Sequence, residues 1–125
     1  MATLSALAAV ALFACAEAAT EVPLITPEAL VSSPPTGAVI LDVRSPREYA
    51  EGHVPGAINL PHDQVSLRIA ELGLESDPPI VVYCERGRRA GIAEAVLLEA
   101  GFSDVRHLEG DMSGWRAAGR PTEKP

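Results

Sequence analysis

Short apolar runs separated by polar, turn-forming residues recur along most of this chain. Continuous apolar runs of this kind are typical of strands that are buried on both faces of a parallel sheet. Residues 38–43 and 80–83 are such runs, and further strands are predicted at residues 57–60 and 105–108. The run at residues 80–83 is the clearest, because Pro78 and Pro79 break the chain directly before it.

Amphipathic segments fall between these runs and predict helices. Thr26 and Ser45 each precede a proline and an acidic residue, which is the pattern of a capped helix start. Further helices are predicted at residues 62–72, 91–100 and 111–117. The apolar stripe of the 91–100 helix would consist of Ile92, Ala93, Val96, Leu97 and Ala100. Alternating strands and helices predict one α/β domain with a parallel sheet covered by helices.

The composition supports one hydrophobic core and narrows the class of partner. Hydrophobic residues make up 47% of the chain and aromatic residues 4%, so the core must consist mainly of aliphatic side chains. The net charge of −7 argues against a nucleic-acid partner, since binding phosphates requires a basic surface. Arg86, Arg88 and Arg89 form a local exception to this acidic background. They predict a pocket for a small anion.

The N-terminal residues differ from the rest of the chain. Residues 1–16 carry no charge and are mostly apolar, and small residues at 14–18 offer cleavage sites. We expect a signal peptide at residues 1–18, a short linker at 19–25 and the folded domain at 26–122. The expected location is the periplasm, with a lipid anchor at Cys15 as an alternative. No Lys or Arg precedes the apolar run, which departs from the usual signal-peptide pattern. A buried N-terminal helix is a second alternative.

Cys84 stands directly after the clearest strand, and it is the thiol that remains once a signal peptide has been removed. A thiol beside arginines and at the start of a helix is expected to be largely thiolate near neutral pH, which is its nucleophilic form. Gly87 allows the backbone N–H groups of the loop to turn toward an anion. Cys84 is therefore the candidate catalytic nucleophile. An inert, buried cysteine is the alternative.

Several motifs then appear in a characteristic order. They are Leu41-Asp42-Val43-Arg44, Glu48-Tyr49, Gly52-His53-Val54-Pro55-Gly56-Ala57-Ile58-Asn59, Val82-Tyr83-Cys84 with Gly87 and Arg89, and Leu108-Glu109-Gly110 with Trp115. In this order and spacing they resemble the signatures of single-domain rhodaneses, a family of sulfurtransferases. The resemblance covers nearly everything from Thr26 to Pro121. It implies a rhodanese-like α/β fold with a small, mostly parallel sheet of about five strands and helices on both faces.

The resemblance also implies a reaction. Cys84 would take the outer sulfur of thiosulfate or a similar anionic donor as a persulfide, and would pass it to cyanide or a thiol. Substrate binding would involve Glu85, Arg86, Gly87, Arg88 and Arg89, without a metal or organic cofactor. Related phosphatases place an arginine where Ala90 stands here, so phosphatase activity is not expected. A non-catalytic binding or redox-sensing module at the cell envelope is the alternative function.

The remaining polar and aromatic residues of interest are given structural roles. Asp42 is expected to bond to nearby backbone, Arg44 and Glu48 to form an ion pair, and Glu85 to point to solvent. The other expectations are a turn or packing role for His53, no metal-binding pattern around His62 and His107, and closure of the core by Trp115.

Overall fold

The computed structural model describes residues 21–74 and 77–125, so the predicted signal peptide and Cys15 lie outside the described residues. One five-stranded sheet runs through the domain in the order β1-β5-β4-β2-β3, and each neighbouring pair of strands is parallel. The strands are β1 (Leu24–Ile25), β2 (Val39–Asp42), β3 (Ile58–Asn59), β4 (Ile80–Tyr83) and β5 (Val105–Leu108). The predicted α/β fold is confirmed.

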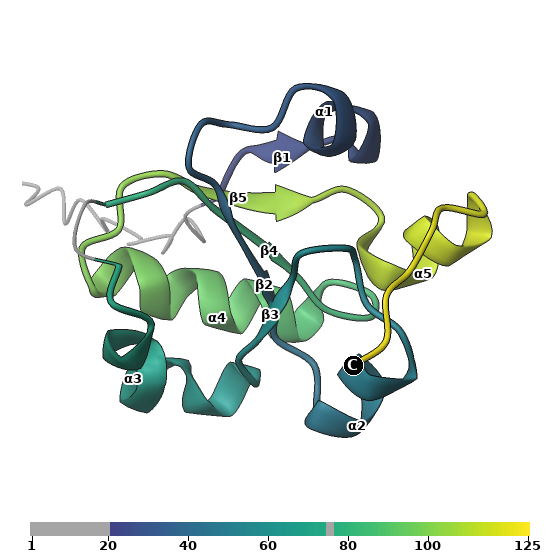
Figure 1. Cartoon of the computed structure of the whole chain (residues 1–125). Helices are drawn as coiled ribbons and strands as arrows, with labels where there is room; N and C mark the ends of the chain where they lie inside the picture. Colours follow the sequence, from purple (N-terminus) through teal and green to yellow (C-terminus); the bar gives the residue numbers. More distant parts are fainter. Residues whose placement is uncertain (1–20, 75–76) are drawn as a thin grey trace, which may run out of the picture.

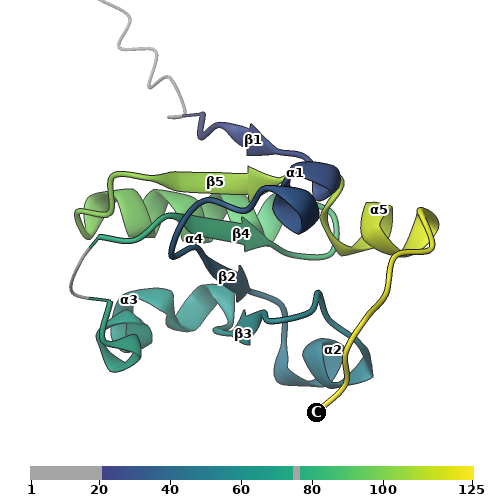
Figure 2. The ribbon, with the colours of Figure 1, turned by 45° about the horizontal axis from the view of Figure 1, so that its top comes forward.

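Helices cover both faces of this sheet (Figures 1 and 2). The helices are α1 (Pro27–Ser32), α2 (Pro46–Glu51), α3 (Val65–Arg68), α4 (Arg88–Glu99) and α5 (Asp111–Ala117), with 3₁₀ turns η1 (His62–Gln64) and η2 (Ile69–Leu72). Side chains of α3 and α4 pack against one face of the sheet, and side chains of α1 and α5 pack against the other. The core consequently has two layers.

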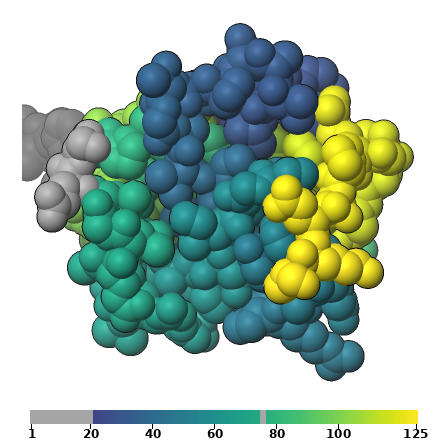
Figure 3. Space-filling view, viewed as in Figure 1, coloured from purple at the N-terminus to yellow at the C-terminus, as the bar shows by residue number. Residues whose placement is uncertain are grey.

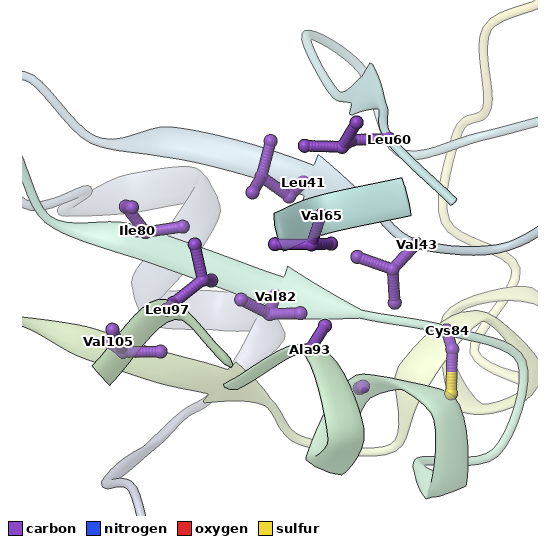
Figure 4. Close-up of a cluster of buried hydrophobic side chains, with 11 residues drawn as sticks. Leu41, Val43, Leu60, Val65, Ile80, Val82, Cys84, Ala93, Leu97 and Val105 are labelled. Atoms are coloured by element: carbon purple, nitrogen blue, oxygen red, sulfur yellow. The ribbon is translucent and has the colours of Figure 1, made fainter. Parts of the chain in front are cut away.

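The alternation of side chains along β4 determines where the cysteine lies. Ile80 and Val82 belong to the core layer under α3 and α4, whereas Val81 and Tyr83 belong to the opposite layer. Because successive residues of a strand point to opposite faces, Cys84 continues the row of Ile80 and Val82. Figure 4 shows Cys84 at one end of this aliphatic cluster. The thiol thus lies on the α4 side of the sheet.

Some predicted boundaries differ from the structure. Residues 24–25, which we assigned to a linker, form the edge strand β1, which is too short to show an alternation in the sequence. The predicted 62–72 helix is divided into η1, α3 and η2. The helix predicted at 91–100 begins earlier, at Arg88, and ends at Glu99. Its apolar stripe is correct at Ala93 and Leu97. It is wrong at Ile92, which is 48% exposed, and at Ala100, which is exposed beyond the end of the helix.

The C-terminal segment closes the second core layer and lies over the region of α2 (Figure 3). Trp115 is 1% exposed, as predicted, and its indole N–H donates a hydrogen bond to the Pro121 carbonyl at 2.9 Å. The backbone of Glu123 forms an isolated antiparallel bridge with His53, whose ring stacks on Tyr49. His53 therefore has the packing role that was expected. No helix in residues 21–74 or 77–125 is long and apolar enough to span a bilayer.

Candidate active site

A cavity of about 410 Å³ opens at the carboxyl end of β4. It is lined by His62, Cys84, Glu85, Arg86, Arg88, Arg89 and Ile92. The chain leaves β2 toward β3 on one side and leaves β4 toward β5 on the other, so the cavity lies where the strand order reverses. Such switch points are the usual ligand sites of parallel sheets. Cys84 is only 1% exposed, which places its side chain at the cavity floor.

Gly87 holds the cysteine sulfur through its backbone. Its N–H group donates a hydrogen bond to Cys84 Sγ at 2.9 Å. Gly87 has a φ of +114°, which favours glycine. A Cβ at this position would lie 3.3 Å from Asp111 Oδ2 and 3.7 Å from the His107 ring. The backbone conformation therefore strains any other residue here, and the space beside Asp111 leaves little room for a Cβ.

The first turn of α5 fixes the backbone of the same loop. The Cys84 N–H donates to Asp111 Oδ1 at 3.0 Å, while the Met112 N–H donates to the Cys84 carbonyl at 3.0 Å. The Ser113 N–H donates to the Glu85 carbonyl at 3.1 Å. These bonds satisfy backbone groups of the loop that would otherwise be buried without partners.

Asp111 belongs to a nearly buried charge network under the loop. The His107 ring bonds Asp111 Oδ2 through Nε2 at 2.9 Å and Glu94 Oε2 through Nδ1 at 2.7 Å. The hydrogen bonds to Asp111 and Glu94 raise the pKa of His107 to about 10, against the opposing effect of burial. His107 is consequently an imidazolium at neutral pH. This network could not be predicted from the sequence, because its members come from three separate elements, α4, β5 and α5.

Arg89 lines the cavity, but its guanidinium forms an ion pair with Glu48 of α2. Its Nη1 and Nη2 atoms donate to the two carboxylate oxygens of Glu48 at 2.6 and 2.9 Å. Glu48 is held in place by a capping box with Ser45, as the sequence of the helix start suggests. The hydrogen bond with Arg89 lowers the pKa of Glu48 to about 2.

The predicted ion pair between Arg44 and Glu48 is wrong. Arg44 is 2% exposed and instead pairs with Asp42 at 2.7 Å, where it is surrounded by the carboxyl ends of the central strands. Asp42 also accepts the backbone N–H of Arg44 at 3.0 Å, which confirms its predicted bond to nearby backbone. The Tyr83 hydroxyl donates to Asp42 as well, at 2.8 Å. Arg44 and Asp42 thus connect the carboxyl ends of the central strands β2 and β4 beside the loop.

We expected Glu85 to point into solvent, and this expectation is wrong. Its side chain is 26% exposed and pairs with Arg44 on one side and Arg116 of α5 on the other. Two cations partly offset a carboxylate that lines the cavity next to the cysteine. The expectation failed because Arg116 is distant in sequence and reaches Glu85 only through the position of α5.

Arg86 and Arg88 differ from the other arginines of the site. Both are exposed and both line the cavity. Within residues 21–74 and 77–125, neither makes an ion pair with a carboxylate. The cationic character of the cavity mouth therefore comes chiefly from these two side chains.

The comparisons with known proteins agree with this geometry. Residues 26–118 match the model of the family described as Rhodanese-like domain. The chain belongs to the rhodanese family. Over 95 residues it is 38% identical to the thiosulfate sulfurtransferase GlpE of Pseudomonas fluorescens, a match that covers 74% of this chain and 84% of that protein.

Solved rhodanese structures are similar to this chain as well. A rhodanese with anions from E. coli matches at 34% identity with a TM-score of 0.60, over 70% of this chain and 99% of that chain. The solution structure of the rhodanese-like domain of Anabaena Alr3790 matches at 30% identity with a TM-score of 0.71, over 84% and 81% of the two chains. The family resemblance of the motifs is confirmed.

Sequence reasoning missed two cavity residues of this rhodanese-family domain. His62, which we considered only for metal binding, lines the cavity from η1, and Ile92 lines it from α4. Ile92 follows Arg88 by one helical turn, which could have suggested that both occupy the same face. In the described part of the chain, no group of His, Cys, Asp and Glu side chains could hold a metal ion.

Proposed function

We propose that this protein is a thiosulfate sulfurtransferase in which Cys84 carries the transferred sulfur. Membership of the rhodanese family and the similarity to relatives named thiosulfate sulfurtransferase support sulfurtransferase activity in general. The observation that carries the specific proposal is the position of Cys84. Its side chain lies at the floor of a cavity, and the Gly87 N–H bonds the sulfur. At the mouth lie Arg86 and Arg88, which pair with no carboxylate of residues 21–74 and 77–125.

In the first half-reaction, the Cys84 thiolate attacks the outer sulfur of thiosulfate. A bond forms between the two sulfurs, the S–S bond of thiosulfate breaks, and sulfite leaves with the electron pair. The product on the protein is a Cys84 persulfide. Arg86 and Arg88 hold the anionic oxygens of the donor and of the departing sulfite, which stabilises the charge that moves during the transfer.

In the second half-reaction, a nucleophilic acceptor attacks the outer sulfur of the persulfide. The S–S bond breaks, and its electron pair returns to Cys84 as a thiolate. Cyanide yields thiocyanate, and a thiol yields a new persulfide. The Gly87 N–H faces the sulfur that alternates between thiolate and persulfide, so the same contact serves both halves.

Steady-state assays test this function. The full chain should form thiocyanate from thiosulfate and cyanide with parallel lines in double-reciprocal plots, as expected when one substrate leaves before the next binds. Cys84→Ser should form none. Cys15→Ser is the matched control, since it removes the chain's other thiol, and it should retain activity. A wild-type protein without turnover would contradict the proposal and favour the binding or redox-sensing module.

We further propose that the protein is exported after cleavage within or near residues 14–18. The uncharged, apolar composition of residues 1–16 supports this proposal. Mass spectrometry of the protein from a fractionated bacterial host should find the mature N-terminus after residue 16 or 18 in the periplasm. Retention of Met1 in the cytoplasmic fraction would contradict it.

A further inference from the structure

Three charged residues lie together under the Cys84 loop, and none of them lines the cavity. Glu94 is 7% exposed and Asp111 is 5% exposed, and the His107 ring lies largely buried between them. Charged residues are rarely buried unless they are paired, and a buried pair seldom adds stability over apolar side chains of similar volume. The network therefore points to a role other than stability.

The geometry of the network requires a doubly protonated ring. Glu94 Oε2 lies 2.7 Å from His107 Nδ1, and Asp111 Oδ2 lies 2.9 Å from Nε2. An ionised carboxylate only accepts hydrogen bonds, and a neutral imidazole has a single N–H to donate. Both contacts are hydrogen bonds only when each ring nitrogen carries a proton. The imidazolium thus links the middle of α4 to the first turn of α5.

Asp111 transmits this constraint to the loop that carries the cysteine. Its second oxygen, Oδ1, accepts the Cys84 N–H at 3.0 Å. Gly87 lies against the same pair of side chains, since a Cβ built on it would be 3.3 Å from Asp111 Oδ2 and 3.7 Å from the His107 ring. The Gly87 N–H in turn donates to Cys84 Sγ at 2.9 Å. The first and last residues of this loop therefore both contact the pair of Asp111 and His107.

We propose that His107 and Glu94 are positioning residues for the uptake of sulfur by Cys84. Glu94 holds the ring on α4, and the ring holds the Asp111 carboxylate. That carboxylate holds the backbone of Cys84, so the sulfur and the N–H that bonds it keep their relative position. The inference rests on the sulfurtransferase function proposed above and concerns the rate of its first half-reaction.

The chemical step itself is unchanged by this role. The Cys84 thiolate forms a bond to the outer sulfur of thiosulfate, whose S–S bond breaks as sulfite leaves with the electron pair. No proton moves within the network, and neither His107 nor Glu94 touches the donor. Their effect is geometric, and a displacement of about 1 Å at a reacting group can lower a rate roughly 100-fold.

Positioning and donor binding involve different residues. Arg86 and Arg88 line the cavity, whereas Glu94 and His107 do not. Loss of the network should therefore lower the maximal rate of sulfur uptake and leave the half-saturating concentration of thiosulfate near its wild-type value. A general loss of folded protein would instead reduce the amplitude of uptake and leave its rate constant unchanged.

The need for a second proton on the ring makes the positioning dependent on pH. The hydrogen bonds to Asp111 and Glu94 raise the pKa of His107 to about 10. Those two carboxylates and the backbone of Gly87 face the ring, and its register neighbours on β4 and β1 are apolar: Val82 and Leu24. As pH rises through 10, the ring loses one donor, so the maximal rate should fall. Ionisation of the Cys84 thiol acts in the opposite direction, since thiolate increases with pH.

Single-turnover uptake of sulfur measures this dependence. Full-length wild type and variants are mixed with a series of thiosulfate concentrations at neutral and alkaline pH. The added sulfur is quantified by intact mass after quenching, and circular dichroism verifies folding at each pH. No acceptor is present, so the first half-reaction alone is observed.

Glu94→Gln separates the charge of the network from its hydrogen bond. The amide oxygen still accepts from Nδ1, and Asp111 still raises the pKa of His107, so the maximal rate at neutral pH should stay close to wild type. The alkaline decline should begin roughly one to two pH units lower, because one of the two carboxylates that hold the proton has lost its charge. Glu99→Gln is the matched control. It makes the same charge change at an exposed position of α4 and should follow the wild-type profile.

His107→Gln removes the link between the two carboxylates. Its amide donors share one nitrogen and cannot reach Glu94 and Asp111 on opposite sides. We expect sulfur uptake to be about tenfold slower than in the wild type at neutral pH, with little change in half-saturating thiosulfate. If this variant does not fold, the comparison of Glu94→Gln with Glu99→Gln decides.

Failure of this inference differs from failure of the sulfurtransferase function. A wild type that takes up no sulfur at any pH contradicts both. A wild type that takes up sulfur, together with a Glu94→Gln profile that coincides with that of Glu99→Gln, overturns the positioning role alone. A folded His107→Gln variant with the wild-type rate does the same. A change confined to half-saturating thiosulfate also overturns it, since the network would then act on donor binding.

Discussion

The backbone N–H of Cys84 donates a hydrogen bond to Asp111 Oδ1 at 3.0 Å, although 27 residues separate the two in the sequence. Asp111 also binds the His107 ring and has a φ of +54°, which is unusual for a residue other than glycine. One side chain thus connects the proposed nucleophile to the charge network under the loop. A strained conformation at such a point is typical of residues that position a site.

Two substitutions of Asp111 should distinguish the role of its hydrogen bonds from the role of its negative charge. Asp111→Asn keeps an acceptor oxygen and tolerates the positive φ, whereas Asp111→Ala leaves the Cys84 N–H and a His107 ring nitrogen without partners. We expect Asp111→Ala to lose about 1–3 kcal/mol of unfolding free energy per buried donor and to lower kcat by roughly tenfold or more. Asp111→Asn should stay closer to wild type. Urea denaturation and the thiocyanate assay measure both effects, and equal behaviour of the two variants would contradict this role.

Gly87 provides a second test of the loop. Gly87→Ala should cost roughly 1–3 kcal/mol in stability, since its φ is +114° and the added Cβ meets Asp111 Oδ2 at 3.3 Å. The same variant should slow sulfur uptake, because the N–H that bonds Sγ must shift. Gly91→Ala is the control: it lies in α4 with nothing within 4 Å of the added Cβ, and it should stabilise the protein by roughly 0.5–1 kcal/mol. Thermal or urea unfolding of both variants should give opposite signs.

The structural features that depend only on residues adjacent in the sequence could be predicted from it. The apolar runs of β2 and β4, the capped starts of α1 and α2, and the place of Cys84 after β4 are all local features. Ion pairs and hydrogen bonds between side chains that are brought together by the strand order of the sheet could not be predicted. Glu48 was assigned to nearby Arg44, yet it pairs with Arg89, which lies 41 residues away and enters the site from α4.

Two further differences have physical reasons of the same kind. Strand β1 has two residues, so it shows no alternation and exists only because β5 offers a free edge. Ile92 fits the apolar period of α4, but the cavity leaves it uncovered. Periodicity indicates which face of a helix is apolar, whereas the surrounding elements decide whether that face is buried.

The His107 network predicts a dependence of stability on pH. The pKa of His107 is raised to about 10 by Asp111 and Glu94 and is near 6.5 in the unfolded chain. The folded state therefore retains a proton that the unfolded state has lost, and its stabilisation is complete below pH 6.5 and disappears as pH rises through 10. In this window the unfolding free energy should fall by at most about 1.4 kcal/mol per pH unit. NMR titration of the ring, assigned with His107→Gln, should give a pKa near 10; an ordinary value would contradict the network.

The pair between Glu48 and Arg89 should limit binding of the donor. Glu48→Gln preserves the capping box but no longer neutralises Arg89, so a further cation becomes available at the cavity. We expect KM for thiosulfate to fall roughly two- to five-fold. Stability should change by no more than about 1 kcal/mol, since both side chains are nearly a third exposed.

Glu51→Gln serves as the matched control for this experiment. It makes the same charge change in α2, but Glu51 pairs with the exposed Arg47. Its KM for thiosulfate should stay near that of the wild type. An equal fall of KM in both variants would assign the effect to net charge, and an unchanged KM in Glu48→Gln would show that Arg89 does not reach the donor.

The uptake of sulfur by the full chain tests the central claim most directly. After incubation with thiosulfate and removal of the donor, intact mass spectrometry should show the addition of one sulfur atom to the wild type and to Cys15→Ser. Peptide mapping should locate this sulfur on Cys84, and Cys84→Ser should gain none. A wild type whose mass stays unchanged, or a Cys84→Ser variant that still takes up sulfur, would contradict the account.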